Sequence, residues 1–479
     1  MYFVEVILPL SLAKTFTYKV SEAEFHFVKN GMRVVVPFGK SKMYTALIID
    51  KHQNEPLLYE AKEIDQILDE KPIVTEFQIA HWQWIASYYM CAIGDVYRGA
   101  MPSALLLESE TIISQKQSVI VDESLLSDEE FLIYQALQQQ SSLRIQDITA
   151  ILNKKNIFPV VQKLIDKNIL VLQEEVQELY KPKLVRYVRL HSKYDSNSGL
   201  SELLETLKSA SKQREIVLTY FQLNAVEKQP ISVKKLLEST NSTAAIVKAL
   251  IEKEILEEYF IQEDRINFEG NAQEAALQLS VAQQQACEQI KERFASKEVC
   301  LLHGVTSSGK TEIYIKLIEE QLAIGKQVLY LLPEIALTTQ LVGRLRIYFG
   351  DKVGVYHSKY SNNERVELWK QVLEQSPKAQ IVIGARSALF LPFSNLSLVI
   401  VDEEHEQTFK QVDPAPRYHA RDAAIVLANT HQAKVLLGSA TPSIETYFNA
   451  QSDKYGWVEI TERYGNVQLP EIELVDLKD

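Results

Sequence analysis

Short apolar runs separated by polar turns occupy the first part of the chain, up to about residue 105. Runs rich in Val, Ile and Leu predict β-strands, whereas the helical spacing of apolar positions at 75–90 predicts one helix. We therefore expect a small, mainly β module with one helix packed on it. Its predicted strands are 3–10, 33–39 and 44–50.

From about 125 to 265 the pattern changes to short amphipathic helices, and one piece occurs twice. VVQKLIDKNIL (160–170) and IVKALIEKEIL (246–256) align without a gap at an offset of 86 residues. A helix followed by Ile-Leu and a short hairpin is typical of the end of a winged helix, so we predict two such units. The alternative is that short helices resemble one another in any protein. The polar segment 193–202 is expected to be an exposed linker between the units.

From about residue 272 onward, short strands rich in Val, Ile and Leu alternate with helical segments. This alternation predicts a parallel sheet covered by helices on both faces. The predicted strands are 299–305, 327–333, 353–358, 380–385, 396–405 and 434–440.

Composition narrows the class of protein. The 479 residues carry 51 Lys and Arg against 63 Asp and Glu, a net charge of −12. This balance argues against a uniformly basic protein but allows one basic groove on a protein that is acidic overall. At about 150 residues per domain, the length predicts about three domains.

Compartment signals are consistent with a protein of the reducing cytoplasm. The three cysteines lie far apart and form no CxxC pair, so neither a disulfide scaffold nor a zinc site is expected in this chain. The sequence contains no run of about 18 uncharged apolar residues, so no membrane span is predicted. The N-terminus has no basic start and carries Glu5 and Pro9 within its apolar stretch, which favours a strand over a signal peptide.

The segment GVTSSGKT (304–311) satisfies the pattern G-x-x-x-x-G-K-[S/T] between a predicted strand and a predicted helix. Small residues let backbone N–H groups surround phosphates, and the helix N-terminus adds positive dipole. Lys310 is expected to reach the β- and γ-phosphates, and Thr311 to hold Mg²⁺. The alternative is a chance glycine turn. The predicted ATP-binding residues here are Gly304, Val305, Thr306, Ser307, Ser308, Gly309, Lys310 and Thr311.

VIVDEEH (399–405) delivers two carboxylates to the carboxyl end of a strand, where ligands of α/β sheets bind. Asp402 is expected to bind Mg²⁺ and Glu403 to act as the general base on water, with Lys310 the third catalytic residue. The alternative is an ordinary acidic cap. A third motif, GSATPS (438–443), can hydrogen-bond the acidic loop through small hydroxyl residues; alone it would be an ordinary strand-to-helix turn.

In this order the three motifs resemble superfamily 2 DExH helicases. More narrowly, the chain resembles the PriA family of primosomal replication-restart helicases at both ends. The further segments that carry this resemblance are LPLSLAKTFTY (8–18), VPFGK (36–40), SYYMCAIGDVYRGAMP (87–102), LLPEIALT (331–338), YHS (356–358), IVIGARSALFLPF (381–393) and RYHARDAAIV (417–426).

The resemblance implies a multidomain α/β and β protein with a β-rich module, a winged-helix region and a RecA-like P-loop lobe. It implies these domains: 1–105, 3′-end DNA binding; 106–192, winged helix; 193–270, linker and second winged-helix-like unit; 271–479, the first, ATP-binding helicase lobe.

The resemblance also assigns residues. Gln283 would recognise adenine, although Gln284 and Gln285 leave the register open. Residues expected to couple nucleotide state to DNA are His405, Arg417, Tyr418, His419, Ser439 and Thr441, of which Tyr418 has a buried core tyrosine as its alternative. Residues expected to bind the 3′ end of DNA are Phe16, Thr17, Gly39 and Lys62.

Two positions depart from the family pattern. Ser307 stands where the family has Gly in the P-loop, which is costly only if that residue needs a positive φ. Thr17 stands where the family has Asp after the Phe, so one hydroxyl oxygen replaces a charged carboxylate. Phe16 and Gly39 have an alternative as a core residue and a turn former of the β module.

The function implied is an ATP-dependent 3′→5′ DNA helicase that recognises stalled forks and D-loops and initiates primosome assembly in a bacterial, nucleoid-associated cytoplasmic setting. Its cofactors would be ATP and Mg²⁺, with zinc only in the family's C-terminal portion. Its partners would be branched and single-stranded DNA, single-strand-binding protein and components that load the replicative helicase. Without a second lobe, the chain alone is expected to be weakly active. The alternatives are a structure-specific DNA-binding fragment with an idle nucleotide pocket, and an RNA helicase or restriction-type translocase.

Overall fold

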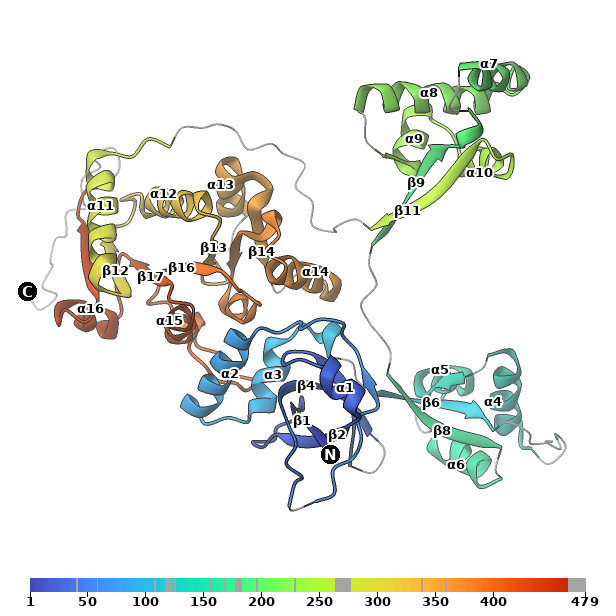
Figure 1. Ribbon diagram of the computed structural model, residues 1–479, viewed down its shortest axis with the longest axis horizontal. Helices are drawn as coiled ribbons and strands as arrows, with labels where there is room; N and C mark the ends of the chain where they lie inside the picture. The colour runs from blue at the N-terminus through green and yellow to red at the C-terminus, as the bar shows by residue number, and fades with distance from the viewer. Residues whose placement is uncertain are drawn as a thin grey trace, which may run out of the picture. The chain divides into compact units, whose positions relative to one another are not determined.

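The protein is described by a computed structural model, in which the chain forms two compact units, Met1–Tyr180 with Phe268–Asp479, and Lys181–Asn267 (Figure 1). Each unit is described by itself. Residues 464–479, at the end of the predicted lobe 271–479, lie outside the described residues, as do the last residues of the motifs at 36–40, 331–338 and 356–358. The structure describes residues 1–463 except 40–41, 58, 107–108, 117–122, 124–125, 141, 155–156, 168, 177–182, 195–196, 228–229, 263–276, 337–338 and 358–359.

The N-terminal module is built on a five-stranded antiparallel sheet of order β2-β1-β4-β3-β5. Its alternating apolar positions bury one core against α1, which begins at a capping box between Ser21 and Glu24. Three strands match the prediction, whereas β2 and the short β5 were missed. The elements are β1 Tyr2–Ile7, β2 Phe16–Val20, α1 Glu22–Phe27, β3 Arg33–Phe38, β4 Lys42–His52 and β5 Gln66–Ile67.

The expectation of a single helix in this module is wrong. Helix α2 (Glu76–Tyr88) is the predicted one and is capped by Thr75, but α3 (Ile93–Ala100) and the short η1 (Ser103–Leu105) follow it. The glycines of α3 argue against a helix in the sequence, yet Gly94 is what lets α3 approach the sheet. A Cβ there would lie 1.9 Å from the carbonyl oxygen of Leu10.

The lobe contains a seven-stranded parallel sheet of order β14-β15-β13-β16-β17-β12-β18. All six predicted strands are present, and the edge strand β18 was missed. The strands are β12 Val299–Gly304, β13 Gln327–Leu331, β14 Val353–Tyr356, β15 Ile381–Gly384, β16 Leu396–Asp402, β17 Lys434–Ser439 and β18 Gly456–Ile460.

Helices cover both faces of this sheet, as predicted. Successive residues of one strand enter two separate apolar cores: Leu329 and Val399 lie in one, and Val328 and Ile400 in the other. The helices are α11 Val281–Ser296, α12 Lys310–Ala323, α13 Thr339–Phe349, α14 Asn362–Leu373, α15 Ala420–Thr430 and α16 Ile444–Gln451; the short helical turns are η4 Gly350–Lys352, η5 Pro377–Ala379, η6 Arg386–Phe390 and η7 Gln407–Phe409.

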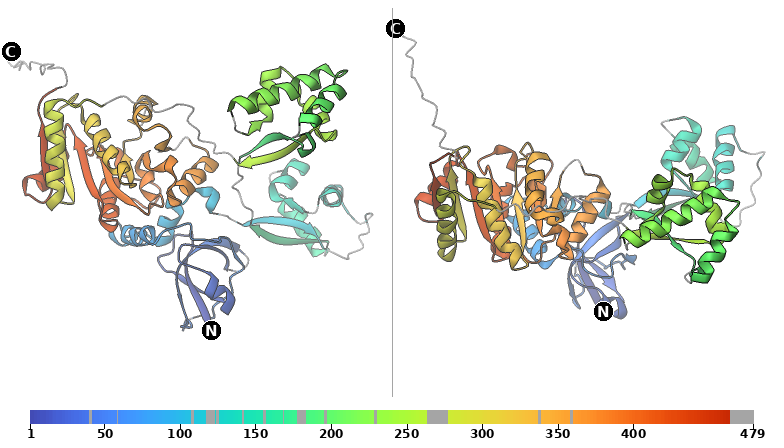
Figure 2. Two further views of the ribbon diagram at one scale, coloured as in Figure 1. Left: turned by 45° about the horizontal axis from the view of Figure 1, so that its top comes forward. Right: turned by 90° about the horizontal axis from the view of Figure 1, so that it is seen from above.

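One of these cores extends into the N-terminal module. Trp82 of α2 and Tyr97 of α3 are fully buried in the same cluster as the lobe residues of β16 and α15, and both views of Figure 2 show the light-blue helices against the orange and red lobe. Polar contacts accompany this packing. The side-chain nitrogens that donate across the junction are Gln78 Nε2 to Phe390 O (2.6 Å), His81 Nε2 to Ala423 O (2.9 Å) and Trp369 Nε1 to Ile73 O (2.8 Å).

The two repeated segments end two units of one design. Helices α6 and α10 and the strands after them, β8 and β11, correspond at the offset of 86 residues. The sheets have the orders β7-β6-β8 and β10-β9-β11. The first unit contains β6 Ser109–Gln115, α4 Asp128–Gln139, β7 Ser142–Arg144, α5 Ile145–Leu152, α6 Phe158–Asp166 and β8 Leu170–Val176. The second contains β9 Leu184–Leu190, η3 Ser192–Tyr194, α7 Asn197–Thr206, α8 Ser211–Glu227, β10 Ile231–Ser232, α9 Val233–Thr240, α10 Ala244–Glu252 and β11 Leu256–Gln262.

The strand after each last helix pairs with the first strand of its own unit. Two expectations for this region need correction. Residues 184–190, expected in the first winged helix, form β9 of the second, because β9 pairs along its length with β11 and buries Val188 and Leu190 in that unit's core. The expected linker 193–202 runs into α7, whose Leu203 is buried.

Among the described residues, no helix combines the length and the apolar character needed to cross a membrane.

We predict that acid weakens the junction between module and lobe. Burial lowers the pKa of His81 to about 4, and that of the partly exposed His431, which packs on Phe77, to about 4. Because both folded-state pKa values lie below the ordinary value of 6.5, the neutral forms stabilise the fold fully above pH 6.5. That stability is lost as pH falls from 6.5 towards 4, by about 1.4 kcal/mol per pH unit for the fully buried His81.

The measurement is the thermal midpoint of unfolding between pH 7.5 and 4.5. In His81→Gln an amide can still donate to Ala423 O but does not titrate, so its midpoint should fall less steeply with pH than the wild-type midpoint. Parallel curves for the two proteins would contradict the assignment.

Candidate active site

The P-loop lies between the end of β12 and the start of α12, and it borders a cavity of about 500 Å³. Gly309 has φ +80°, and a Cβ there would lie 2.0 Å from Gln283 Nε2, so only glycine fits. Lys310 Nζ donates to the carbonyl oxygen of Gly304 at 3.1 Å. The cavity is lined by Thr306, Ser307, Ser308, Gly309, Lys310, Thr311, Glu312, Arg344, Asp402, Glu403, His405, Ala440 and Thr441.

Two serines of the loop bear on its fit to phosphate. Ser307 has φ +65°, so the residue that departs from the family's glycine does occupy the left-handed region, at a cost of about 1–2 kcal/mol. Ser308 Oγ is buried and has no hydrogen-bond partner in the described part of the chain. An orphaned hydroxyl beside a glycine cradle at a helix N-terminus fits the phosphates of a nucleotide.

Gln283 is the one of the three neighbouring glutamines that touches this loop. Its side-chain Nε2 donates to the carbonyl oxygens of Ser308 at 3.3 Å and Gly309 at 3.4 Å, and its Oε1 accepts from the Ser280 N–H. Gln284 and Gln285 are exposed. The buried Gln283 amide therefore tethers α11 to the P-loop, while its role toward adenine stays a prediction.

Asp402 ends β16 with each carboxylate oxygen held by a buried tyrosine. Tyr314 Oη donates to Oδ1 and Tyr330 Oη to Oδ2, both at 3.0 Å. Burial, followed by the Glu403 charge, raises the pKa of Asp402, and the two tyrosine hydrogen bonds oppose that rise. Gly438 of the third motif leaves room for this arrangement, because a Cβ there would lie 1.7 Å from Tyr314 Oη. Sequence reasoning assigned no role to either tyrosine.

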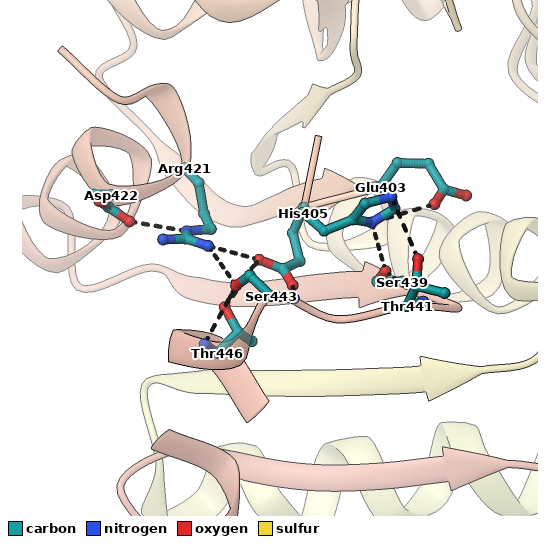
Figure 3. Close-up of polar contacts among 9 residues, drawn as sticks. Glu403, His405, Arg421, Asp422, Ser439, Thr441, Ser443 and Thr446 are labelled. Carbon is teal, nitrogen blue, oxygen red and sulfur yellow. Dashed lines mark hydrogen bonds and ion pairs between the residues drawn. The ribbon is translucent and has the colours of Figure 1, made fainter. Parts of the chain in front are cut away.

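Glu403 faces the cavity from a strained backbone. Its φ is +50° and its side chain is 40% exposed. His405 Nδ1 lies 2.8 Å from Ser439 Oγ, and His405 Nε2 lies 3.4 Å from Thr441 Oγ1 (Figure 3). The structure thus brings together three residues of the predicted coupling set, joining the acidic loop to the turn after β17.

The other three predicted coupling residues have different surroundings. Tyr418 is 1% exposed and packs edge-on against Phe390, which favours its alternative as a core tyrosine, while its coupling role stays a prediction. Arg417 is exposed, and its Nε donates to Val412 O. The His419 backbone N–H donates to Tyr89 Oη of the N-terminal module at 3.1 Å.

A second cavity, of about 740 Å³, lies at the carboxyl end of the same sheet. Its walls come from segments that follow β13, β14, β15 and β16, which include the family-like motifs at 331–338 and 381–393. The lining residues are Leu332, Pro333, Glu334, Ile335, Thr339, His357, Ala385, Arg386, Thr408 and Phe409.

The four residues predicted for the DNA 3′ end gather around one edge of the module. Lys62 Nζ donates to the Gly39 carbonyl oxygen at 2.9 Å, and Phe16 packs edge-on against Phe38 with ring centroids 5.0 Å apart. Gly39 has φ +72° and nothing within 4 Å of an added Cβ, which leaves open space beside its backbone.

Thr17 is less available than expected. Its Oγ1 donates to Glu5 Oε2 at 2.8 Å across the β1–β2 pair, and its N–H donates to Tyr59 Oη. Glu5 therefore places a carboxylate next to Thr17, the position at which the family has Asp. Sequence reasoning missed Glu5, although the cross-strand position of 5 opposite 17 follows once the hairpin is recognised.

Four family models match the chain. One described as 3′DNA-binding domain (3′BD) matches residues 5–102, and one described as DEAD/DEAH box helicase matches 280–449. A winged helix domain model matches 110–175, and one described as Winged helix domain, PriA helicase, Bacteroidota matches 185–262. Together with the parallel sheet, these matches confirm the predicted fold class, including both winged-helix units.

Curated relatives align with the whole chain. Replication restart protein PriA of Bacillus subtilis (strain 168) is 32% identical over 489 residues, which is 100% of this chain and 58% of that protein. The protein of the same name from Haemophilus influenzae is 32% identical over 485 residues, 100% of this chain and 54% of that protein. The chain thus spans little more than half the length of these relatives. The solved structure of the DUF1998 helicase MrfA matches at 19% identity with a TM-score of 0.27, over 39% of this chain and 31% of that one.

We predict that the two buried tyrosines keep Asp402 ionised. Each hydroxyl lost in Tyr314→Phe or Tyr330→Phe removes a hydrogen bond to the charged form, worth about 1.5–3 kcal/mol, so the pKa of Asp402 should rise further. Mg²⁺ binds the ionised carboxylate. On acidification the two variants should therefore lose Mg²⁺-dependent nucleotide binding at a higher pH than the wild-type protein.

The measurement is the dissociation constant of a fluorescent ATP analogue with Mg²⁺ from pH 5 to 8. Tyr447→Phe, a change at a partly exposed tyrosine of α16, serves as the matched control and should leave the profile unchanged. A wild-type profile in both tyrosine variants would rule out this role.

Proposed function

Because the chain belongs to the PriA family of replication restart proteins, we propose that it provides the ATP-binding lobe and the DNA-end module of a 3′→5′ DNA helicase. This enzyme would recognise stalled replication forks and D-loops and initiate primosome assembly. The observation that carries the proposal is a single cavity that joins Lys310 of the P-loop to Asp402 and Glu403 at the end of β16.

Each residue of this cavity has a chemical task. The P-loop N–H groups and Lys310 would hold the β- and γ-phosphates, and Thr311 and Asp402 would hold Mg²⁺. When bound, ATP and Mg²⁺ supply the transferable phosphoryl group and the positive charge that offsets its oxygens. Glu403, exposed toward the cavity, orients a water molecule and accepts its proton. The contacts of His405 with Ser439 and Thr441 would then transmit changes in the acidic loop to the turn after β17.

The second cavity is suited to a single strand of DNA. Arg386 and His357 supply donors for phosphate oxygens, while the exposed Ile335 supplies apolar surface. Recognition of this kind depends on backbone charge and stacking rather than on base sequence. Arg417, which is exposed in the loop before α15, can add a further contact to the strand.

The module edge formed by Phe16, Gly39 and Lys62 is proposed to receive the free 3′ end. Residues 1–62 carry eight Lys and Arg against six Asp and Glu, so long-range attraction is modest and a shaped pocket must supply specificity. Glu5, held beside Thr17, provides the carboxylate acceptor that Thr17 lacks for the terminal hydroxyl. Lys62 can reach the last phosphate as a point charge.

The remaining parts of the proposal follow the family. Partners are single-strand-binding protein and components that load the replicative helicase, and the setting is the bacterial cytoplasm at the nucleoid.

We predict that Lys310→Ala in the full-length protein abolishes DNA-stimulated ATP hydrolysis while fork affinity stays within about twofold of wild type. The change removes a charge-assisted phosphate contact, worth about 2–3 kcal/mol, from a site separate from the DNA-end module. Steady-state hydrolysis and fork binding by anisotropy measure the two quantities. Hydrolysis at the wild-type rate in the presence of DNA would show that the P-loop assignment is wrong.

We predict that the module distinguishes a free 3′ end from a blocked one. A fork with a 3′-hydroxyl at the junction should bind more tightly than the same fork with a 3′-phosphate. Phe16→Ala should remove that difference, because stacking of the last base contributes about 1–3 kcal/mol.

Glu5→Gln should also reduce the difference, since an amide accepts more weakly than a carboxylate. Glu22→Gln, an exposed carboxylate of α1, is the matched control and should leave the difference intact. Equal affinity of the wild-type protein for both forks would argue against the 3′-end pocket without bearing on the nucleotide site.

A further inference from the structure

The acidic loop after β16 contains two consecutive glutamates in opposite environments. Glu403 lines the nucleotide cavity and is 40% exposed, whereas Glu404 is fully buried and does not line that cavity. A buried carboxylate is retained only where charge and hydrogen bonds compensate its lost hydration. The role of Glu404 must therefore be sought in its partners.

Four donors converge on the Glu404 carboxylate. Oε1 accepts from the Ser443 N–H at 2.7 Å, and Oε2 accepts from Arg421 NH1 at 2.9 Å. Oε2 also accepts from the hydroxyls of Ser443 at 3.0 Å and Thr446 at 2.9 Å. The Glu404 backbone N–H donates to Gly438 O at 3.2 Å, so both its main chain and its side chain are anchored.

Arg421 closes this network from a third element (Figure 3). Its NH1 donates to Ser443 Oγ at 2.6 Å as well as to Glu404, and its Nε donates to Asp422 at 2.9 Å. Arg421 lies in the first turn of α15, Glu404 in the acidic loop, and Ser443 at the N-cap of α16. One ion pair thus fixes three segments that meet beside the nucleotide cavity.

The same loop holds Glu403 in a conformation that its own residue type disfavours. Its φ of +50° lies in the left-handed region, which a residue with a Cβ adopts only when its surroundings hold it there. The anchors on Glu404 lie immediately after Glu403 in the chain, and no other residue of the loop is buried as deeply. A general base needs a fixed orientation toward its water molecule, and proximity alone is not sufficient.

We infer that Glu404 and Arg421 are positioning residues that hold the backbone of the acidic loop so that Glu403 points into the nucleotide cavity. This inference rests on the proposed function, since it concerns the efficiency of the same hydrolytic site. Through Ser443 the pair also fixes the turn that carries Ser439 and Thr441, the partners of His405.

The test is the split between kcat and KM for ATP in the full-length protein. Glu404→Gln keeps the side-chain volume but replaces an acceptor oxygen by an NH₂ that faces donors, so kcat should fall about 10²-fold while KM stays near wild type. Arg421→Lys keeps the charge and should recover part of the activity that Arg421→Gln loses. The double variant Glu404→Gln/Arg421→Gln should have a kcat no lower than that of the less active single variant, because both changes disrupt the same ion pair.

The matched control is Asp69→Asn in the N-terminal module. Asp69 accepts two hydrogen bonds from the Arg33 side chain and one from its backbone N–H, and both side chains are 7% exposed, so the change breaks a similarly buried pair far from the loop in sequence. It should lower the thermal midpoint but leave kcat unchanged. A similar loss of kcat in Asp69→Asn and Glu404→Gln would reduce the role of Glu404 to general stability and overturn the inference.

A second readout does not depend on hydrolysis. Hydrogen exchange of the amides of residues 402–406 should be faster in Glu404→Gln than in wild type, and unchanged in Asp69→Asn. Unchanged exchange, or a wild-type kcat in a folded Glu404→Gln protein, would overturn the inference. If the wild-type protein does not hydrolyse ATP, the proposed function fails, and the exchange comparison still decides whether Glu404 holds the loop.

Discussion

A carboxylate removed from water must be matched by donors, and this constraint organises the carboxyl end of β16. Asp402 is matched by the hydroxyls of two tyrosines, one from α12 and one from β13. Glu404 is matched by donors from α15 and α16. The strands deliver the carboxylates, but the partners come from four different elements, so satisfying two buried charges also fixes the relative positions of those elements.

The same packing unites two parts of the chain that the sequence presents as separate. The helical half of the N-terminal module has no complete core of its own, because its buried face is shared with the lobe. The side chains of Gln78, His81 and Trp369 donate to backbone carbonyl oxygens. These bonds therefore depend on where the partner's backbone lies and not on its side chain. The helices of the module and the lobe therefore share one hydrophobic core.

The parts that could be predicted are those whose signal is local. The P-loop and the acidic loop use contiguous residues, and six lobe strands are buried on both faces and so appear as continuous apolar runs. Strand β18 was missed because an edge strand carries polar residues, here Glu459 between Trp457 and Ile460. Likewise, the signal for α3 was hidden by a glycine that the tertiary approach requires.

The partners of the site could not be predicted because they are remote in sequence. Tyr314 lies 88 residues before Asp402, and Arg421 lies 17 residues after Glu404, with no spacing rule to relate them. The burial of Tyr418 could not be predicted either. Its neighbours Arg417 and His419 favour a DNA-contacting residue, and only the structure shows that it packs on Phe390. The family resemblance names positions, whereas the contacts that decide their roles arise only from the folded chain.

The shared core also bears on how the chain is synthesised. Gln78 is separated from its partner Phe390 by 312 residues, and His81 from Ala423 by 342. At about 5–20 residues per second, a ribosome needs on the order of 15–70 s to supply those partners. During that interval the side of α2 that packs on the lobe lacks its native partners, although Trp82 can already pack on Tyr97 of α3. The part of the core that joins α2 to the lobe can therefore form only after the lobe has been synthesised.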